Sequence, residues 1–584
     1  MPALPQFDYL FAIGTIFAFL DAWNIGANDV ANSFATSVAS RSLTLKQAMC
    51  IASVMEFAGA MLVGSRVTDT IRTKVISISL FEEDPSVLML AMVCAIVGSA
   101  TYLTIATKCT MPVSTTHSIM GGVIGVGIAA AGPEGVNWSF NGVSQVFAAW
   151  GIAPGISGVF GAIIFLITKY GVMRRNNPVK KAFIMVPLYF FLTSFLLALL
   201  IVWKGGSAKI KLTDYESVGV AFGVGGAVAL IVATFFIPFL HRKIINDDWE
   251  LKGWEVIKGP LLLCRPEPRE RPEGVTTGRI PNFYEGHLTA EELEAKRANQ
   301  SIITQQPQVE DLEKGGAHVS QPKMDRSDSD ITPIPEPTPA VISKRPLRQL
   351  SKPKKIPPPG AWYTPAVLWY WLKYAALRGV EQDVVDQQKH KDFLSGDIEK
   401  IHATGEHYDN RAEYTYSFLQ IMTASTTSFA HGANDVSNAI GPYTTIYFIW
   451  STAKISNKVP VPLWILAFGG AGIVVGLWTY GYNIMRALGN KITLHSPARG
   501  FSMELGAAVT IIMATKLALP VSTTQCITGA TVGVGLCNGT WRTINWRMVA
   551  WIYMGWFVTL PCAGLMSGCL MGLILNAPRW GQGV

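Results

Sequence analysis

The sequence predicts an all-α polytopic membrane protein built from two related halves. The chain has 584 residues, of which 49% are apolar and 15% are charged, and its mean hydropathy is +0.30. This composition is too hydrophobic for an ordinary soluble protein. Apolar stretches of about 20 residues, the length that crosses a hydrocarbon core, recur along the chain. Two short motifs also occur twice, once on each side of a polar centre.

We expect about twelve membrane spans, seven before the polar centre and five after it. The apolar stretches lie near residues 9–25, 46–64, 87–107, 116–131, 145–169, 182–203, 216–240, 415–430, 461–480, 503–519, 521–537 and 544–575. Two of them, 116–131 and 521–537, are short and follow a proline. They are therefore equally consistent with the arms of re-entrant hairpins that do not cross the bilayer.

The composition divides the chain into three regions. Residues 1–240 form the first membrane repeat and the spans that follow it, and residues 414–584 form the second repeat. Residues 241–413 are polar and rich in proline, which predicts a largely disordered cytoplasmic loop. Within this loop, residues 362–378 fit either an interfacial helix or a loop packed on the bundle, and residues 380–413 fit a charged helix.

The charge distribution argues against a nucleic-acid partner. The net charge is +8, but the basic residues gather in loops, as in Arg174, Lys181 and the run at 241–243. A lipid bilayer accounts for this pattern, because loops rich in Lys and Arg stay in the cytoplasm. We expect the central loop to be cytoplasmic and both termini to be extracellular.

The repeated motifs predict an inverted-topology transporter. The word GANDVAN at residues 26–32 recurs as GANDVSN at 432–438, and PVSTT at 112–116 recurs at 520–524. The offsets of 406 and 408 residues nearly agree, so an ordered pair of motifs was duplicated. With seven spans before the loop, the two copies enter the membrane from opposite sides. In such transporters the substrate lies near the bilayer midplane, where the repeats meet.

The two PVSTT segments have the chemistry of an anion site. Proline fits the first turn of a helix, and the hydroxyls that follow it are natural N-cap groups. Two helix N-termini would offer unpaired N–H groups and partial positive charge to an oxyanion. A single copy would more simply be a kinked helix whose hydroxyls bond to the backbone, but the duplication favours binding. The candidate anion ligands are Ser114, Thr115, Thr116, Ser522, Thr523 and Thr524.

The two GANDV segments have the chemistry of a cation site. Acids inside membrane spans are costly and usually mark an ion path, although these two could instead cap helices at the membrane surface. We expect the glycine three residues before each aspartate to permit local unwinding, which would free backbone carbonyls. Carboxylate, amide and carbonyl oxygens together suit sodium. The candidate sodium ligands are Asp29, Asn32, Asp435, Asn438, Asn28 and Asn434, and the last two are also candidate phosphate ligands.

Charge balance links the two sites. Two aspartates and a monovalent phosphate would place about three negative charges in one low-dielectric pocket, which is a heavy penalty. Bound sodium would offset it. We therefore expect more than one cation per phosphate, and each ligand should strengthen the binding of the other.

Two further acids and two lysines also lie in or beside apolar segments. Glu56 and Glu504 are not repeat mates. Each either serves a third cation site or a proton relay, or pairs with a nearby Arg or Lys. Lys108 and Lys516 each precede a PVSTT proline by four residues, and we expect them to extend toward the membrane interface. His117 has no histidine mate, which argues against a symmetric histidine relay.

The GANDVANSFATSV, GANDVSNAIGP and PVSTT segments together closely resemble the inorganic phosphate transporter (PiT) family of sodium–phosphate symporters. The resemblance covers residues 10–240 and 414–575. It implies helical hairpins at PVSTT, a homodimer, transport of monovalent phosphate, and transport roles for Asp29, Asp435, Glu56 and Glu504. The chain looks most like fungal members, which implies a high-affinity permease of the plasma membrane. Gln525 departs from the histidine usual in the family.

Other functions remain open at this point. Proton-coupled phosphate or sulfate transport is the alternative within the transporter class, and a phosphate-sensing receptor that signals through the loop is the alternative outside it. We expect no enzyme, because the sequence contains no Walker loop, nucleophile elbow or HExxH motif. We also expect no cofactor, with sodium present only as a co-transported ion.

Overall fold

The computed structural model describes residues 2–66, 75–76, 81–140, 142–205, 212–272, 278–305, 357–377, 394–456, 459–517, 519 and 521–577. Within these ranges the chain is helical, and the only β interaction is an isolated bridge between Ile76 and Val136. The chain divides into two compact units, Met1–Leu293 with Ala375–Val584, and Glu294–Tyr374. The expected all-α class is confirmed.

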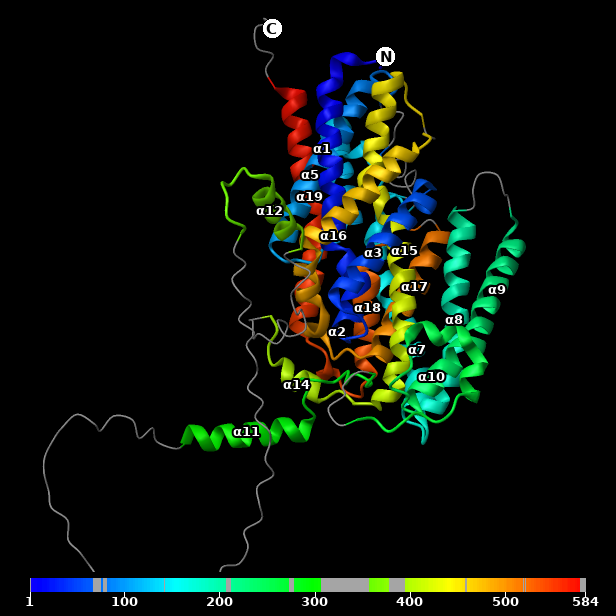
Figure 1. The fold of residues 1–584 in the computed structure, drawn as a ribbon. Helices are drawn as coiled ribbons and strands as arrows, with labels where there is room; N and C mark the ends of the chain where they lie inside the picture. The colour runs from blue at the N-terminus through cyan, green and yellow to red at the C-terminus, as the bar shows by residue number, and fades with distance from the viewer. Residues whose placement is uncertain are drawn as a thin grey trace, which may run out of the picture. The chain divides into compact units, whose positions relative to one another are not determined.

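The helices follow one another along the chain in the order shown in Figure 1. They are α1 (Asp8–Asn28), α2 (Val30–Ala39), α3 (Leu45–Val63), α5 (Pro85–Lys108), α6 (Thr115–Ala131), α7 (Val143–Thr168), α8 (Pro178–Leu200), α9 (Asp214–Ile231), α10 (Ile237–Ile244), α11 (Ala290–Gln305), α12 (Pro365–Leu377), α14 (Ile398–Ala403), α15 (Asn410–Thr452), α16 (Leu463–Ile492), α17 (Pro497–Lys516), α18 (Thr523–Leu536) and α19 (Trp546–Asn576).

Eight helical stretches of the described chain are long and apolar enough to cross a membrane, which is fewer than the twelve spans expected. They are Pro5–Ala39, Leu45–Val63, Pro85–Lys108, Val143–Met173, Pro178–Trp203, Asp214–Ile244, Leu463–Ile492 and Trp546–Asn576. Helices α6 and α18 are too short, with 17 and 14 residues. Helix α15 has 43 residues but carries many buried polar side chains, so its hydropathy is low although its length is ample.

The two PVSTT segments lie at the tips of helical hairpins. Helix α5 ends at Lys108 and α6 begins at Thr115, and the two arms contact each other through the Ser99 and Ser118 hydroxyls at 3.0 Å. Helices α17 and α18 form the second pair, with the motif between them. The 116–131 and 521–537 stretches thus each form one arm of a helical hairpin. Pro520 lies outside the described residues.

The helices that carry the GANDV motifs run antiparallel to each other. Leu4 N donates to Trp450 O at 3.1 Å, and Ser40 Oγ donates to Gln420 Oε1 at 2.7 Å. Helices α1 and α2 therefore begin where α15 ends and end where α15 begins (Figure 1). The first half breaks its helix at Asp29, between α1 and α2, whereas α15 is continuous through its motif.

The motif glycines allow close packing of helices. The helix breaks within the first motif, at Asp29, and continues through the second, where no unwinding is seen. Gly26 lies inside α1 and Gly432 inside α15. A Cβ atom at Gly26 would overlap the Ile473 carbonyl oxygen of α16, and one at Gly432 would overlap the Glu56 carbonyl oxygen of α3. Small residues let the backbones of membrane helices approach each other closely. Glycine is therefore required at both positions because a neighbouring helix packs directly against them.

Each hairpin also packs on a helix of the opposite half. A Cβ atom at Gly125 of α6 would overlap the Gly564 carbonyl oxygen of α19, and one at Gly533 of α18 would overlap the Gly158 carbonyl oxygen of α7. The first hairpin therefore rests on the last helix of the second half, and the second hairpin rests on α7 of the first half.

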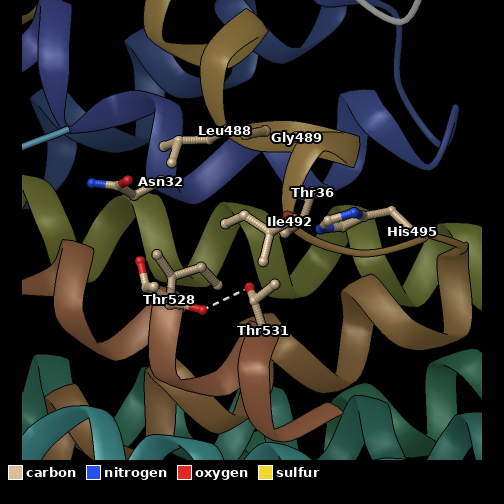
Figure 2. A pocket seen from close by; sticks show the side chains of 10 residues that line it. Asn32, Thr36, Leu488, Gly489, Ile492, His495, Thr528 and Thr531 are labelled. Carbon is tan, nitrogen blue, oxygen red and sulfur yellow. Dashed lines mark hydrogen bonds between the residues drawn. The ribbon is translucent and has the colours of Figure 1, made fainter. Parts of the chain in front are cut away.

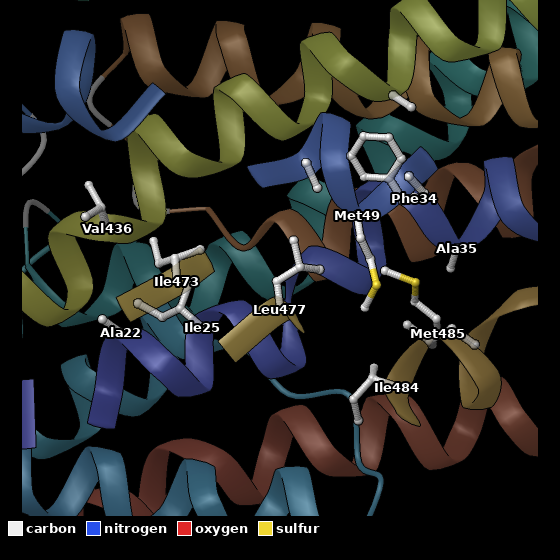
Figure 3. Close-up of a cluster of buried hydrophobic side chains, with 14 of the residues drawn as sticks. Ala22, Ile25, Phe34, Ala35, Met49, Val436, Ile473, Leu477, Ile484 and Met485 are labelled. Carbon is white, nitrogen blue, oxygen red and sulfur yellow. The ribbon is translucent and has the colours of Figure 1, made fainter. Parts of the chain in front are cut away.

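A buried apolar cluster holds the motif helices in place. It joins side chains of α1, α2, α3, α15 and α16, among them Ile25, Phe34, Met49, Val436 and Ile473 (Figure 3). Because protein interiors are close-packed, this cluster fixes the positions of the polar motif residues on the same helices.

The described residues between the membrane repeats include several short helices, and residues 306–356 of the expected disordered loop lie outside the described residues. Arg242 of α10 forms a buried ion pair with Asp248, which follows the helix, at 3.0 Å. Helix α12 covers most of the segment for which an interfacial helix or a packed loop was expected. Of the charged helix expected over 380–413, residues 380–393 lie outside the described residues, and α14 and the start of α15 cover much of the remainder.

Candidate functional site

One buried carboxylate joins both hairpin tips. Thr115 Oγ1 of the first hairpin donates to Asp29 Oδ2 at 2.7 Å, and Thr524 Oγ1 of the second donates to Asp29 Oδ1 at 3.0 Å. All three side chains are buried. Asp29 makes no side-chain cap at the start of α2, so the alternative role of helix capping does not describe it. The structure thus brings the two halves together at the residues that the repeats singled out.

The motif asparagines also bond across the two halves. Asn32 Nδ2 donates to Thr524 Oγ1 at 2.8 Å, whereas Asn438 Nδ2 donates to Thr115 Oγ1 and to Thr116 Oγ1, both at 3.1 Å. Each asparagine therefore holds the hydroxyls of the hairpin from the other half. This exchange gives the site an approximate twofold arrangement.

The second aspartate belongs to a chain of three ionisable side chains. His431 Nε2 lies 3.0 Å from Asp435 Oδ2, and His431 Nδ1 is hydrogen-bonded to Glu56 Oε2 at 2.7 Å. Ser428 Oγ donates to Glu56 Oε1 at 2.8 Å, and Thr523 Oγ1 donates to Asp435 Oδ2 at 3.2 Å. The partner of Glu56 is thus a histidine and not the Arg or Lys considered from the sequence.

His431 is a site residue that the sequence interpretation missed. One ligand atom each from Asp29, His431 and Asp435 lies within 4.8 Å of the others, and all three side chains are buried. Two signals were available: His431 directly precedes the second motif, and it stands four residues before Asp435 on one helix face. Its repeat position in the first half is Ile25, so the search for matched pairs passed over it.

Other motif residues shape the hairpin tips. Asn28 Nδ2 donates to Thr107 Oγ1 and Met111 O, both at 3.0 Å, and Asn28 Oδ1 accepts from Val113 N at 3.2 Å. The Asn28 side chain therefore holds the first hairpin loop. Ser114 and Ser522 are the N-cap residues of α6 and α18, and the side chain of Ser114 accepts from His117 N. Asn434 is only partly buried.

Glu504 occupies a separate polar centre between α2, α15 and α17. Thr36 Oγ1 and Ser37 Oγ donate to Glu504 Oε1 at 2.5 and 2.8 Å, and Gln420 Nε2 donates to the same oxygen at 3.2 Å. Thr423 Oγ1 donates to Glu504 Oε2 at 2.6 Å. Among the described residues, no Arg or Lys forms an ion pair with Glu504. Its carboxylate is instead hydrogen-bonded by three hydroxyls and one amide.

The lysines that precede the PVSTT segments lie away from this site. Lys108 is exposed at the end of α5. Lys516 forms an exposed ion pair with Asp214 at 2.5 Å and lies over the ring of Trp203. These placements agree with the surface role expected for them. His117 accepts a hydrogen bond from Trp150 Nε1 at 3.2 Å, away from both aspartates.

A small pocket leads away from the central site. It extends from Asn32 past α16 and α18 to His495 (Figure 2). Burial lowers the pKa of His495 to about 4, so this side chain is neutral at physiological pH and places no positive charge in the pocket. The lining residues are Asn32, Ala35, Thr36, Leu488, Gly489, Ile492, His495, Ile527, Thr528 and Thr531.

The site therefore combines two kinds of donor. Carboxylate and amide oxygens are the ligands of hard cations, and hydroxyls at two helix starts suit an oxyanion. The two sets share atoms, because Thr115 and Thr524 bond directly to Asp29. Any cation and anion held here would lie close together, and each would reduce the charge penalty of the other.

Comparison with known proteins gives consistent results. A family model described as "Phosphate transporter family" matches residues 25–567. The chain is 57% identical to the phosphate-repressible phosphate permease pho-4 of Neurospora crassa, over 99% of each chain. It is 28% identical to sodium-dependent phosphate transporter 2 of Felis catus, over 98% of this chain and 99% of that one. A solved sodium-dependent phosphate transporter matches the fold with a TM-score of 0.64 at 24% identity, over 98% of this chain and all of the other.

Proposed function

The chain belongs to the phosphate transporter family, and from that membership we propose that it is a symporter that imports monovalent inorganic phosphate together with sodium across the plasma membrane. The observation that carries the proposal is the bonding of Asp29 to the first hairpin hydroxyl on one oxygen and to the second on the other. This contact puts a candidate cation ligand directly against two candidate anion donors.

Phosphate is proposed to bind at the starts of α6 and α18. Helix N-termini offer N–H groups and partial positive charge without a fixed basic side chain, so they can hold an anion and still release it. The proposed ligands are the hydroxyls of Ser114, Thr115, Thr116, Ser522, Thr523 and Thr524. A role for Asn28 and Asn434 is less direct, because Asn28 holds the hairpin loop and Asn434 is partly exposed.

Sodium is proposed to bind among Asp29, Asp435, Asn32 and Asn438. Asp29, Asp435 and Glu56 would carry three negative charges if ionised, and one imidazolium at His431 would compensate only one of them. Adding monovalent phosphate increases the excess of negative charge. More than one sodium ion per phosphate restores the balance, and phosphate and sodium should therefore increase each other's affinity by the same factor.

The proposed architecture is a pair of inverted repeats with the central site near the bilayer midplane. It is supported by the antiparallel course of α1 and α15 and by the position of Asp435 in the middle part of the 43-residue α15. In this arrangement the termini are extracellular, the central loop is cytoplasmic, and the hairpins are re-entrant. A homodimer is proposed only by similarity to the family.

A second candidate function, proton-coupled phosphate transport, is favoured by one specific observation. Glu56, His431 and Asp435 form a row of ionisable groups that reaches the central site, with His431 Nδ1 2.7 Å from Glu56 Oε2 and His431 Nε2 3.0 Å from Asp435 Oδ2. Such chains of acids and histidines relay protons in some membrane transporters.

One experiment separates the two couplings. The purified protein is reconstituted in liposomes, and radioactive phosphate uptake is measured with an inward sodium gradient and then with an inward proton gradient at zero sodium. We expect the sodium gradient to drive accumulation at both pH 6 and pH 8. Accumulation that follows the proton gradient and is indifferent to sodium would replace the sodium assignment.

We expect Thr524→Ala to reduce sodium-driven phosphate uptake. The variant removes a hydroxyl that donates to Asp29 and accepts from Asn32. Hydrogen bonds to charged groups contribute about 1.5–3 kcal/mol, which corresponds to roughly tenfold to hundredfold in affinity. Thr528→Ala, one turn further along α18 in the pocket wall, is the matched control. Uptake normalised to surface expression should fall in the first variant and stay within about twofold in the second.

A further inference from the structure

A buried carboxylate outside the central site lacks a partner on one oxygen. Asp21 of α1 has no exposed surface, and Ser99 Oγ of α5 donates to Asp21 Oδ1 at 2.9 Å. Asp21 Oδ2 is buried and has no hydrogen-bond partner among the described residues. One turn later, the equally buried Asn24 also has an unpartnered carbonyl oxygen, Oδ1. Leaving such atoms unpaired is costly, so this arrangement needs a physical explanation.

These two residues begin a polar seam between α1 and α5. Asp21, Asn24 and Asn28 lie on one face of α1, at spacings of three and four residues. Asn24 Nδ2 donates to Ala100 O at 3.2 Å and to Thr104 Oγ1 at 2.9 Å, and Asn28 reaches the hairpin loop. The seam therefore runs from Asp21 to the tip of the first hairpin.

The position of Asp21 along α1 places it on a defined side of the central site. It precedes Asp29 by eight residues, or about 12 Å along a helix. It therefore lies between the central site and the end of the bundle where α1 begins and α15 ends (Figure 1).

The other half has a comparable centre on the opposite side. Glu504 lies between α15 and α17, which are the repeat counterparts of α1 and α5, and its donors Gln420 and Thr423 precede Asp435. The acid of the first half, Asp21, lies on α1, which carries the GANDV motif. The acid of the second half, Glu504, lies on α17, which is an arm of the hairpin. The α15–α17 interface also buries Glu413, which accepts from Ala498 N at 2.8 Å. Asp21 and Glu504 lie on opposite sides of the central site.

The two centres differ in how their acids are satisfied. Glu504 accepts four hydrogen bonds, whereas Asp21 accepts one and keeps one oxygen without a partner, as does Asn24 one turn later on the same helix. Carboxylate, amide and hydroxyl oxygens without a basic neighbour are a ligand set for a small hard cation.

We propose that Asp21, Asn24 and Ser99 form an additional sodium site, which receives the ion on the side where α1 begins and passes it along the α1–α5 seam to Asp29. This inference rests on the proposed sodium coupling, and it names the residues along which sodium would reach Asp29. A neutral, protonated Asp21 is the competing explanation of the same geometry. Asparagine has the shape of protonated aspartic acid, so Asp21→Asn separates the two.

The test uses the full-length protein in liposomes and measures phosphate uptake against sodium concentration at saturating phosphate. We expect Asp21→Asn to raise the sodium concentration for half-maximal uptake by about tenfold, the effect of losing one charged ligand contact, and to lower the Hill coefficient. Asp21→Glu should recover part of the sodium affinity. Ser99→Ala should shift the curve in the same direction, and Thr101→Ala, an exposed hydroxyl on α5 that bonds only its own helix backbone, should not.

A binding readout without transport completes the test. Sodium alone should raise the unfolding temperature of the purified native protein, and Asp21→Asn should reduce that rise. If Asp21→Asn does not fold, the Ser99→Ala curve decides in its place. A native sodium curve in Asp21→Asn, or in Ser99→Ala where that variant decides, would overturn this inference and leave the proposed function intact. Uptake by the native protein that ignores sodium would overturn both.

Discussion

Asp29→Asn and Asp435→Asn are each expected to reduce sodium-driven phosphate uptake by about 100-fold, which corresponds to roughly 3 kcal/mol. Asp29 accepts one hydroxyl from each hairpin, and Asp435 faces Thr523 and His431. The amide keeps the size of the side chain but removes the negative charge that compensates a cation. The loss should therefore appear as weaker sodium activation and not as lower surface expression.

The matched control is Asp214→Asn. Asp214 pairs with Lys516 on the exposed surface of the bundle, where an ion pair contributes about 0–1 kcal/mol. This variant should transport phosphate with a sodium curve like that of the native protein. Sodium activation that is unchanged in both Asp29→Asn and Asp435→Asn would show that the cation is bound elsewhere.

Gly26→Ala and Gly432→Ala are expected to destabilise the protein more strongly than any single surface change. The added methyl group at Gly26 would overlap the Ile473 carbonyl oxygen, and the one at Gly432 would overlap the Glu56 carbonyl oxygen. Backbone atoms cannot rotate away as side chains do, so the helices must separate. We expect a loss of about 3 kcal/mol or more in each variant, measured as a lower unfolding temperature in detergent.

Gly155→Ala provides the same chemical change without the contact. Gly155 is an exposed residue of α7, and a Cβ atom there meets no heavy atom within 4 Å. Because alanine is a better helix former than glycine, this control should be neutral or slightly more stable. Equal unfolding temperatures for Gly432→Ala and Gly155→Ala would contradict the close-packing role of the motif glycine.

Repetition in the sequence was sufficient to locate much of the candidate site. Two motifs that recur in the same order at nearly equal offsets indicate that this part of the chain was duplicated. Polar motifs that recur inside apolar segments in this way indicate a shared binding site. That reasoning reached Asp29, Asp435, Thr115 and Thr524, which the structure brings together or within reach of one another. The family resemblance based on the same words is confirmed by the family model.

Residues without a repeat mate were harder to find. His431 aligns with Ile25, and Asp21 aligns with Thr427, so neither survives a search for matched pairs. Their surroundings come from neighbouring helices, because Glu56 reaches His431 from α3 and Ser99 reaches Asp21 from α5. Sequence spacing within one helix does not reveal such contacts, which depend on how the helices are packed.

The sequence pattern also did not predict where the helices that carry the GANDV motifs begin and end. Polar residues near position 435 suggested the end of an apolar segment, yet α15 continues through them for 43 residues. Some of its polar side chains bond to side chains of other helices, as Asn438 does to Thr115 and Thr116, and several of its hydroxyls bond to the backbone of α15 itself. Hydropathy measures a single segment, and it undervalues a helix whose polar atoms are bonded inside the bundle.

The exchange of hairpin supports affects the order in which the protein can be assembled. Helix α6 is synthesised early, but the glycine face that it uses fits α19, which follows roughly 400 residues later. The ribosome therefore releases the first hairpin into the membrane before its packing partner exists. Its docking on α19 can therefore take place only after that later helix has been synthesised.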